Sequence, residues 1–119
     1  MQSNINYQIW YKVCRPLRIK YNLSANCVMI LNGTYLLYMI TGKPFTRYQL
    51  RSFVSYYNGK YIDKYITVLV SRDMISLAGL RSGRQIYSIS ELGLQVINDL
   101  NKSYQEQLYI FCNKYSIEL

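Results

Sequence analysis

The stretch 46–93, TRYQLRSFVSYYNGKYIDKYITVLVSRDMISLAGLRSGRQIYSISELG, decides the fold. Its first part predicts a helix that begins behind Thr46, a residue type that caps helix N-termini, and extends to about Tyr57. The apolar residues of this helix recur at helical spacing: Tyr48, Leu50, Phe53, Val54 and Tyr57. A second helix is predicted over about 60–71, because its apolar residues return to one face at the helical period. These residues are Ile62, Ile66, Leu69 and Val70.

The second part of the stretch predicts a β-hairpin followed by a third helix. Residues 74–80 and the alternating run 86–89 flank the basic turn Arg81-Ser82-Gly83-Arg84, in which Gly83 accommodates a positive φ. Ser90 is the expected N-cap of a helix that begins at Glu91. Helix, Asn58-Gly59 turn, helix, basic-tipped hairpin and helix are, in this order, the elements of a winged helix-turn-helix, a module that binds DNA. The predicted fold class is therefore mainly α with a small β-hairpin (α+β).

Two further helices are predicted ahead of this stretch. The first covers residues 5–20, with a break or kink near Arg15-Pro16, because proline in a helix interior costs about 3 kcal/mol. The next has Ser24 as its N-cap and ends near Thr41, where Gly42-Lys43-Pro44 supplies the stop signals. This helix is apolar almost all round, which predicts a central core helix. Phe45 is expected to form a very short strand that pairs with the hairpin.

The last predicted helix extends from Glu91 to about Tyr115 without a breaker. Some 25 residues make roughly 37 Å, which is longer than a compact domain of this size can cover. We therefore expect the far half of this helix and the first helix to pair with a second copy of the chain. The single domain 1–119 would then consist of dimerisation helices at 1–23 and 94–119 around a DNA-binding part at 24–93. The expected dimer contacts are Ile9, Trp10, Val13, Leu100, Tyr104, Leu108 and Phe111.

Charge is distributed unevenly along the 119 residues. The net charge is +8; residues 1–84 hold twelve Lys and Arg against two Asp, whereas residues 85–119 hold two Lys against four Asp and Glu. The positive field thus coincides with the predicted DNA-binding part, as a polyanionic partner requires. The basic cluster Arg15, Arg18 and Lys20 fits a solvated face and a phosphate contact about equally well.

Composition argues against several other classes of protein. The chain has no His, and Cys14, Cys27 and Cys112 lack metal-ligand spacing, so neither a zinc site, an imidazole base nor a cofactor is expected. Buried structural thiols are expected, since a redox switch would need an exposed, low-pKa thiolate. The fourteen tyrosines come without the accompanying groups of a tyrosine nucleophile, and we expect no enzyme. No apolar run of about 20 residues and no signal-peptide layout occur, which predicts a cytoplasmic protein away from membranes.

The candidate DNA contacts lie on both predicted helices and on the hairpin. With its apolar residues turned inward, the 60–71 helix presents Tyr61, Lys64 and Thr67 outward and Asp63 partly so. Lys can reach guanine, Asp can accept from cytosine, and Tyr can donate to a phosphate or pack on a thymine methyl; which residue does which stays open. The hairpin tip would reach the minor groove or its phosphates, the alternative being a solvated loop. The candidates are Arg47, Arg51, Lys60, Tyr61, Asp63, Lys64, Thr67, Arg81 and Arg84.

The order of elements over nearly the whole chain resembles the MarR-type transcriptional regulators, small dimeric winged-helix repressors. Phe45-Thr46-x-x-x-Leu50 resembles the Leu-Thr-x-x-x-Leu opening of their helix-turn-helix, and Leu69-x-x-x-x-Met74-Ile75 their exit into the first wing strand. The most specific likeness is that of Tyr87-Ser88-Ile89-Ser90-Glu91-Leu92-Gly93 to their Tyr-x-Leu-Thr-x-x-Gly segment. The sequence departs from the family at Asp73, where the family usually has Gly.

The resemblance implies a homodimeric regulator that binds double-stranded DNA. It places Tyr61, Asp63 and Lys64 on DNA-reading positions, Arg84 on the wing arginine, and Arg47 and Arg51 on backbone-contacting positions. It also implies a possible small aromatic effector between the dimer helices and the DNA-binding lobe. An alternative is a winged-helix protein-interaction module that does not read DNA, because the long apolar C-terminal helix could dock on a different protein.

Overall fold

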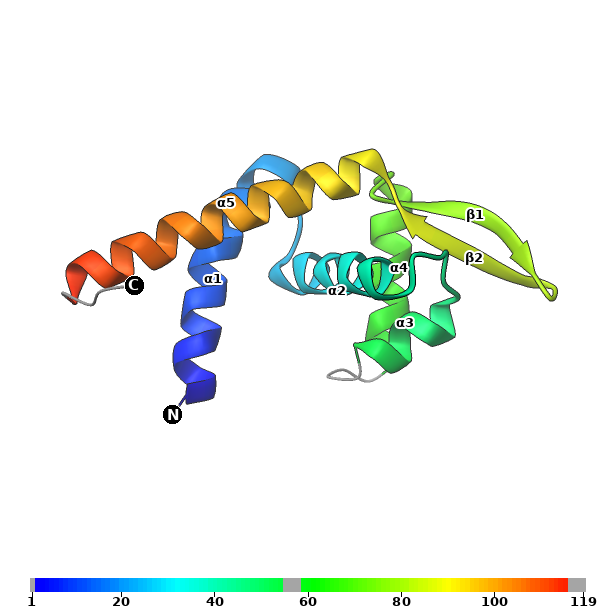
Figure 1. Ribbon diagram of the computed structural model, residues 1–119, viewed down its shortest axis with the longest axis horizontal. Helices are drawn as coiled ribbons and strands as arrows, with labels where there is room; N and C mark the ends of the chain where they lie inside the picture. The colour runs from blue at the N-terminus through cyan, green and yellow to red at the C-terminus, as the bar shows by residue number, and fades with distance from the viewer. Residues whose placement is uncertain (1, 55–58, 116–119) are drawn as a thin grey trace.

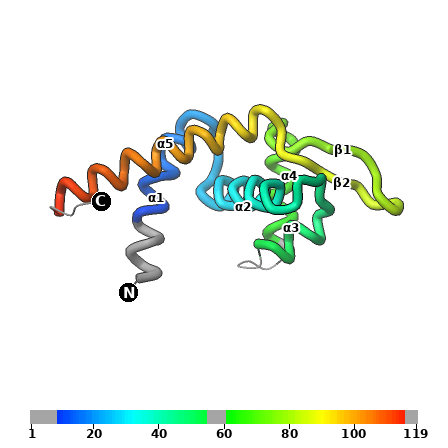
Figure 2. The backbone as a smooth tube through the Cα atoms, viewed as in Figure 1, coloured from blue at the N-terminus to red at the C-terminus, as the bar shows by residue number. Residues whose placement is uncertain are grey.

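The computed structural model confirms a mainly helical fold with one β-hairpin (Figure 1). It describes the backbone of residues 2–54 and 59–115 and the side chains of residues 9–54 and 61–115 (Figure 2). In chain order the elements are α1 (Gln2–Tyr21), α2 (Ala25–Thr41), α3 (Arg47–Phe53), α4 (Gly59–Ser71), β1 (Ile75–Arg81), β2 (Arg84–Ile89) and α5 (Glu91–Lys114).

Helix α2 is the central element, and it packs against α1, α3, α4, β2 and α5. Ser24 caps it as predicted, with its Oγ accepting from the Cys27 N–H at 3.1 Å, and Gly42 ends it at φ 65°. Val28 and Leu31 are fully buried, whereas Met39 and Ile40 are exposed. The prediction of a helix buried all round therefore holds for the first half only, because α3 and the hairpin cover one side of the second half.

A break or kink is predicted near Arg15-Pro16; helix α1 continues through Pro16, so the chain does not break there. The ring removes one backbone donor and crowds the preceding turn. Val13 and Leu17, on either side of Pro16, are buried, and the Ser103 hydroxyl of α5 donates to the Val13 carbonyl at 2.7 Å. Packing against α5 thus holds the helix together across the proline.

Helix α3 is shorter than predicted and ends at Phe53; Tyr57 lies outside the described residues. Leu50 and Val54 are buried, but Tyr48 is 63% exposed, so its assignment to the apolar face is wrong. The reason is geometric: Tyr48 precedes Leu50 by two residues, about 200° around the helix.

The end of α4 explains the departure at Asp73. The Met74 N–H bonds to the Leu69 carbonyl at 3.0 Å and the Asp73 N–H to the Val70 carbonyl at 3.1 Å, the pairing of a Schellman motif. Asp73 occupies the left-handed position of that motif, with φ 60°. Aspartate tolerates this conformation better than most residues, so it fills a place that usually favours glycine.

The hairpin forms as predicted, with Arg81 paired to Arg84 across a two-residue turn. Ser82 and Gly83 both have positive φ, 51° and 77°, as a type I′ turn requires. Phe45 pairs with the hairpin as predicted, but through a single β-bridge: its N–H donates to the Tyr87 carbonyl at 2.9 Å and its carbonyl accepts from the Tyr87 N–H at 2.7 Å.

The junction of the hairpin and α5 is closely packed. The Ser90 hydroxyl accepts from the Gly93 N–H at 3.0 Å and donates to the Asp73 carbonyl, while the Ser90 N–H bonds to the Met74 carbonyl at 3.1 Å. A Cβ on Gly93 would lie 2.3 Å from the Met74 oxygen and 2.7 Å from Ile89 Cγ1. Ser90 and Gly93, which match the Thr and the Gly of the Tyr-x-Leu-Thr-x-x-Gly segment, are therefore required by contacts with the backbone.

The far ends of α1 and α5 separate from each other (Figure 1). The radius of gyration is 15.4 Å and the longest extent 55 Å, whereas a compact chain of this length has a radius of about 13–14 Å. The 24 residues of α5 make a rod of about 36 Å. The distal half of α5 thus extends beyond the core of its own chain, as predicted.

The three thiols are buried, and burial raises the pKa of Cys14 to about 12. Within the described residues, no group of three or more His, Cys, Asp or Glu could hold a metal ion. No single helix in the same part of the chain is long and apolar enough to cross a bilayer. Helices α1 and α2 reach that length only together, and they meet at 96°.

Replacing Gly93 by Ala is expected to lower the free energy of unfolding by about 1–3 kcal/mol, because the new methyl overlaps a backbone oxygen that cannot rotate away. Gly33→Ala is the matched control, since its Cβ would meet only the Val54 side chain, at 2.3 Å. Urea unfolding should therefore show the larger loss for Gly93→Ala. The reverse order would contradict the described junction.

Candidate nucleic-acid interface

Helix α4 presents a polar face outward, because its apolar residues are used in the core. Ile62, Ile66 and Leu69 are at most 1% exposed. On the other side Tyr61 is 55% exposed, and Lys64 and Thr67 are also exposed. These three positions confirm the predicted orientation of the helix. The side chain of Lys60 lies outside the described residues.

Helix α3 is positioned by a capping box at its N-terminus. Thr46 Oγ1 accepts from the Gln49 N–H at 3.1 Å, and Gln49 Oε1 accepts from the Thr46 N–H at 2.9 Å. This arrangement satisfies two backbone donors that would otherwise be unpaired. It starts the helix so that Arg47 and Arg51 both face α4.

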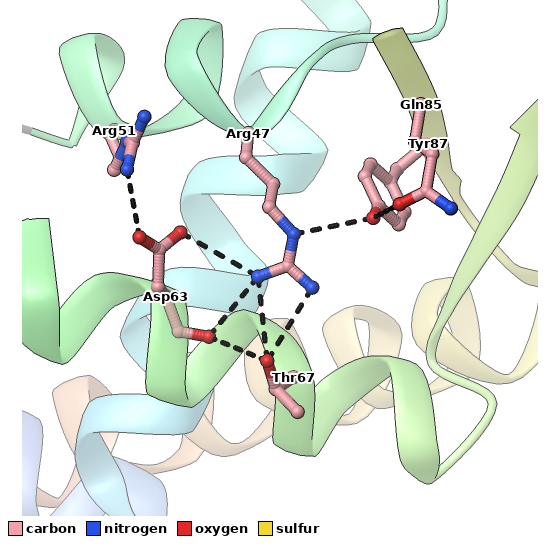
Figure 3. Close-up of polar contacts among 6 residues, drawn as sticks. All are labelled: Arg47, Arg51, Asp63, Thr67, Gln85 and Tyr87. Atoms are coloured by element: carbon pink, nitrogen blue, oxygen red, sulfur yellow. Dashed lines mark hydrogen bonds and ion pairs between the residues drawn. The ribbon is translucent and has the colours of Figure 1, made fainter. Parts of the chain in front are cut away.

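Asp63 of α4 lies between these two arginines (Figure 3). Its Oδ2 accepts from Arg51 Nη1 at 2.8 Å, and its Oδ1 is 3.6 Å from Arg47 Nη1. Arg47 also donates to the Asp63 carbonyl at 3.3 Å and to Thr67 Oγ1 at 3.4 Å. The sequence-predicted residues Arg47, Arg51, Asp63 and Thr67 therefore form one network, which we call the arginine–aspartate network.

The network continues from Arg47 to the wing. Arg47 Nε donates to the Tyr87 hydroxyl at 3.3 Å, and its guanidinium lies 5.3 Å from the centre of the Tyr87 ring (Figure 3). The Tyr87 hydroxyl donates in turn to Gln85 Oε1 at 2.9 Å. Arg47 thus joins α3, α4 and β2, a role that its sequence position did not indicate.

A notch of about 330 Å³ opens between α3 and β2. Arg47, Arg51 and Arg84 contribute guanidinium groups to its lining, and Tyr48 and Tyr87 contribute phenol rings. Guanidinium groups bind phosphate oxygens through paired N–H donors. The notch therefore has the chemistry of a phosphate site, and Tyr48, Gln85 and Tyr87 are lining residues that sequence reasoning missed as site residues.

Arg81 does not line this notch. Its Nη2 donates to the Pro44 carbonyl at 3.1 Å. Together with Lys43 it borders an open cavity of about 740 Å³ between α2, α3 and β1. Leu37, Phe45 and Phe53 supply apolar walls. Arg81 and Arg84 are both exposed, but Arg81 lines the 740 Å³ cavity and Arg84 lines the notch.

Part of the predicted dimer surface is wrong. Val13 and Leu100 are buried within the protomer, at 0% and 3% exposed, because they pack α1 against α5. They offer no surface to a second copy. Tyr104 is exposed, and four other candidates are half-buried: Ile9, Trp10, Leu108 and Phe111. A cavity of about 360 Å³ lies between the separating ends of α1 and α5, with Ile9, Ile110 and Phe111 in its lining.

The basic cluster on α1 is partly neutralised. Lys20 pairs with Asp99 of α5 at 2.9 Å, and the Tyr21 hydroxyl donates to the same carboxylate oxygen. Those two hydrogen bonds hold the pKa of Asp99 below its usual value. Arg72, at the end of α4, donates to the Tyr21 and Asn22 carbonyls. These contacts connect the end of α1 both to α5 and to α4.

Comparison with known proteins relates this geometry to a fold. The sequence matches no protein-family model and no curated protein. Three solved structures are similar: MepR, a transcription regulator of the Staphylococcus aureus multidrug efflux pump MepA, RV1404 from Mycobacterium tuberculosis, and the transcriptional regulator Tm0710 from Thermotoga maritima.

MepR is 12% identical with a TM-score of 0.76, and the alignment covers 94% of this chain and 79% of MepR. RV1404 is 11% identical with a TM-score of 0.70, and the alignment covers 95% of this chain and 73% of RV1404. Tm0710 is 10% identical with a TM-score of 0.68, and the alignment covers 95% of this chain and 76% of Tm0710. At these identities the likeness is one of fold. The chain shares the fold of these proteins, and the predicted winged helix-turn-helix fold is confirmed.

Proposed function

We propose that the chain is a sequence-specific DNA-binding transcriptional regulator that acts as a homodimer. In this proposal α4 enters the major groove and the hairpin tip reaches the backbone or the adjacent minor groove. The observation that carries it is the continuous polar and cationic face made by the outward side of α4, the arginines of α3 and the tip of the wing. The fold shared with two transcription regulators supports it.

Charge supports DNA as the partner. Residues 1–84 hold twelve Lys and Arg against two Asp, a net charge of +10, and one of those Asp, Asp63, is paired with Arg51. A surface of this kind attracts phosphates without regard to sequence. Base discrimination would come from Tyr61 and Lys64, which face outward near the start of α4.

Dimerisation is supported by the unpartnered end of α5. Tyr109 and Ile110 are more than half exposed, although they lie on a helix whose proximal half is packed on the core. A second copy inserting there would bury them together with the half-buried Phe111, and it would fill the cavity between α1 and α5. Two-fold symmetry would then present two α4 helices to two DNA half-sites.

A small aromatic effector is a finer part of the proposal. The 740 Å³ cavity lies within the DNA-binding part, not between it and the dimer helices as the resemblance implied. It offers apolar and aromatic walls with Lys43 and Arg81 at its border, which suits a planar anion. Since Arg81 belongs to the wing, occupancy would act on the element that meets DNA. The proposal implies a cytoplasmic protein that requires no cofactor and meets no membrane.

The alternative is a winged-helix module that binds another protein and does not read DNA. The same exposed residues on distal α5 favour it, because a different chain could cover them. A stable homodimer in light scattering, without any partner added, favours the regulator. A monomer that binds no duplex favours the module.

Lys64→Ala should cost about 1–3 kcal/mol of binding to the preferred duplex and much less to a scrambled one, because it removes a base contact. Arg84→Ala should weaken both duplexes alike and reduce the magnitude of the salt slope by about one, because it removes a phosphate contact. Fluorescence anisotropy across about 50–200 mM salt measures both effects. Lys102→Ala, which removes an exposed charge from α5, is the matched control and should change neither.

Wild-type protein that binds no duplex at about 50 mM salt would refute the proposal, because phosphate contacts are strong there. If Lys64→Ala weakens all duplexes equally while Arg84→Ala alters base preference, their roles are exchanged.

Ile110→Asp should convert the dimer into a monomer, because a carboxylate would be buried at the interface without a partner. Ile110 is 54% exposed in the single chain, so the folded protomer should survive the change. Size-exclusion chromatography with light scattering gives the mass. Leu80→Asp, a similar change on the exposed wing, should leave the dimer intact. An unchanged mass for Ile110→Asp would place the interface elsewhere.

Binding of a planar aromatic anion is checked with 2-naphthoate as the probe. It should raise the thermal unfolding midpoint of the wild type, because a ligand of the folded state stabilises it. Arg81→Ala should reduce that rise and Arg84→Ala should keep it, since only Arg81 borders the cavity. No rise in the wild type, or an equal rise in both variants, would remove this cavity as the effector site.

A further inference from the structure

Both oxygens of the Asp63 carboxylate lie close to the arginines of α3. Its Oδ2 is taken by Arg51 at 2.8 Å, and its Oδ1 is buried, without a hydrogen-bond partner, 3.6 Å from Arg47 Nη1. Reading cytosine requires an exposed carboxylate oxygen directed at the base N4 amine. In this geometry the side chain is directed at α3, although it belongs to the helix that would enter the groove.

The carboxylate changes the charge that α3 presents. Arg47, Arg51 and Asp63 together carry one net positive charge, whereas the two arginines alone would carry two. Their side chains are about one-third exposed, at 33%, 37% and 37%, so a phosphate could reach the guanidinium groups. Each phosphate neutralised by such a group releases counterions and steepens the salt dependence of binding. Asp63 therefore competes directly with DNA phosphates for the same donors.

The two arginines are held differently. Arg47 is anchored by the Asp63 backbone carbonyl, by Thr67 and by Tyr87, contacts that do not involve the carboxylate. Arg51 makes its charged hydrogen bond to the Asp63 carboxylate itself. Loss of that carboxylate would leave Arg47 in place and release Arg51 toward the notch that Arg47, Arg51 and Arg84 line.

We propose that Asp63 is an internal counter-charge that sets DNA specificity by restraining Arg51, and that it does not read a base. The inference rests on the proposed function and deepens it. To bind a DNA phosphate, Arg51 must exchange the Asp63 carboxylate for it. That exchange is favourable where α4 is seated deeply enough to bring a phosphate into the notch. On unrelated sequences Arg51 stays paired, and non-specific affinity stays low.

The test is Asp63→Asn, which keeps the shape and removes the charge. Affinity for the preferred duplex and for a scrambled duplex of equal length is measured over about 50–200 mM salt. The scrambled duplex should bind about 3–30-fold more tightly, with a salt slope steeper by about one for each newly engaged phosphate. The ratio of the two affinities should fall, and base preference at each position should not change.

Asp73→Asn is the matched control. It removes one exposed carboxylate at the other end of α4, and asparagine tolerates the positive φ of 60° found there. It should leave the ratio of affinities unchanged. In an Arg51→Ala background, Asp63→Asn should lose most of its effect on the scrambled duplex. Thermal unfolding midpoints verify that each variant is folded before its affinity is compared.

Three results would overturn the inference. A changed preference at one base pair, with unchanged affinity for the scrambled duplex, would make Asp63 a base-reading residue. Equal weakening of both duplexes would make it a purely structural contact. An unchanged ratio in a folded, DNA-binding variant would show that Arg51 is not restrained. In each of these the wild type still binds DNA, so they are distinguishable from failure of the proposed function, in which the wild type binds no duplex.

Discussion

The burial of one side of α4 against α2 and α3 determines the rest of the candidate interface. Ile62, Ile66 and Leu69 are excluded from solvent, and each buried side chain of this size contributes about 1.5–3 kcal/mol. Rotating α4 about its axis would expose them, so the helix has one permitted orientation. That orientation places Tyr61 and Lys64 outward. The candidate interface is thus a consequence of core packing and requires no separate positioning device.

The second constraint is electrostatic and joins α3, α4 and the hairpin at the surface, beyond the core that they share. Helix α3 is short and the hairpin has few buried residues, yet Arg47 connects both to α4 through Thr67, the Asp63 carbonyl and Tyr87. These contacts are only partly shielded from water, so each is weak alone. Their value lies in geometry. They set the position of the wing relative to α3 and α4, and hence the width of the notch between α3 and β2.

The distal halves of α1 and α5 lie outside the core of the protomer. The proximal halves are joined by buried side chains and by the Ser103–Val13 hydrogen bond, but beyond that point the two helices separate. A helix that keeps apolar residues after leaving its own core is stable when something covers it. At the joined ends of these helices, the Tyr21 hydroxyl donates to Asp99 of α5, and the Tyr21 carbonyl accepts from Arg72 at the end of α4. Movement of α1 relative to α5 would therefore change the contacts of α1 with the end of α4.

Much of the fold and part of the site could be predicted from local patterns. Capping residues, turn residues and apolar periodicity are short-range properties, which is why Ser24, Thr46, Ser90 and the hairpin turn were located correctly. Apart from Tyr48, whose exposure follows from its angle on α3, the misassigned positions depended on distant neighbours. Pro16 is tolerated because α5 packs against α1. Met39 and Ile40 are exposed because none of the residues that the structure describes covers them. Val13 and Leu100 are buried because α1 and α5 of the same chain pack together.

The sequence by itself determined the elements, their order, the basic character of residues 1–84 and the outward positions on α4, because each follows from periodicity or from composition. Only the tertiary structure decided that Asp63 lies between Arg47 and Arg51, that Tyr87 receives Arg47, and that Arg81 and Arg84 serve different hollows. Those pairings join residues 12 to 40 positions apart, and no local pattern encodes which charged side chains meet after the helices have packed.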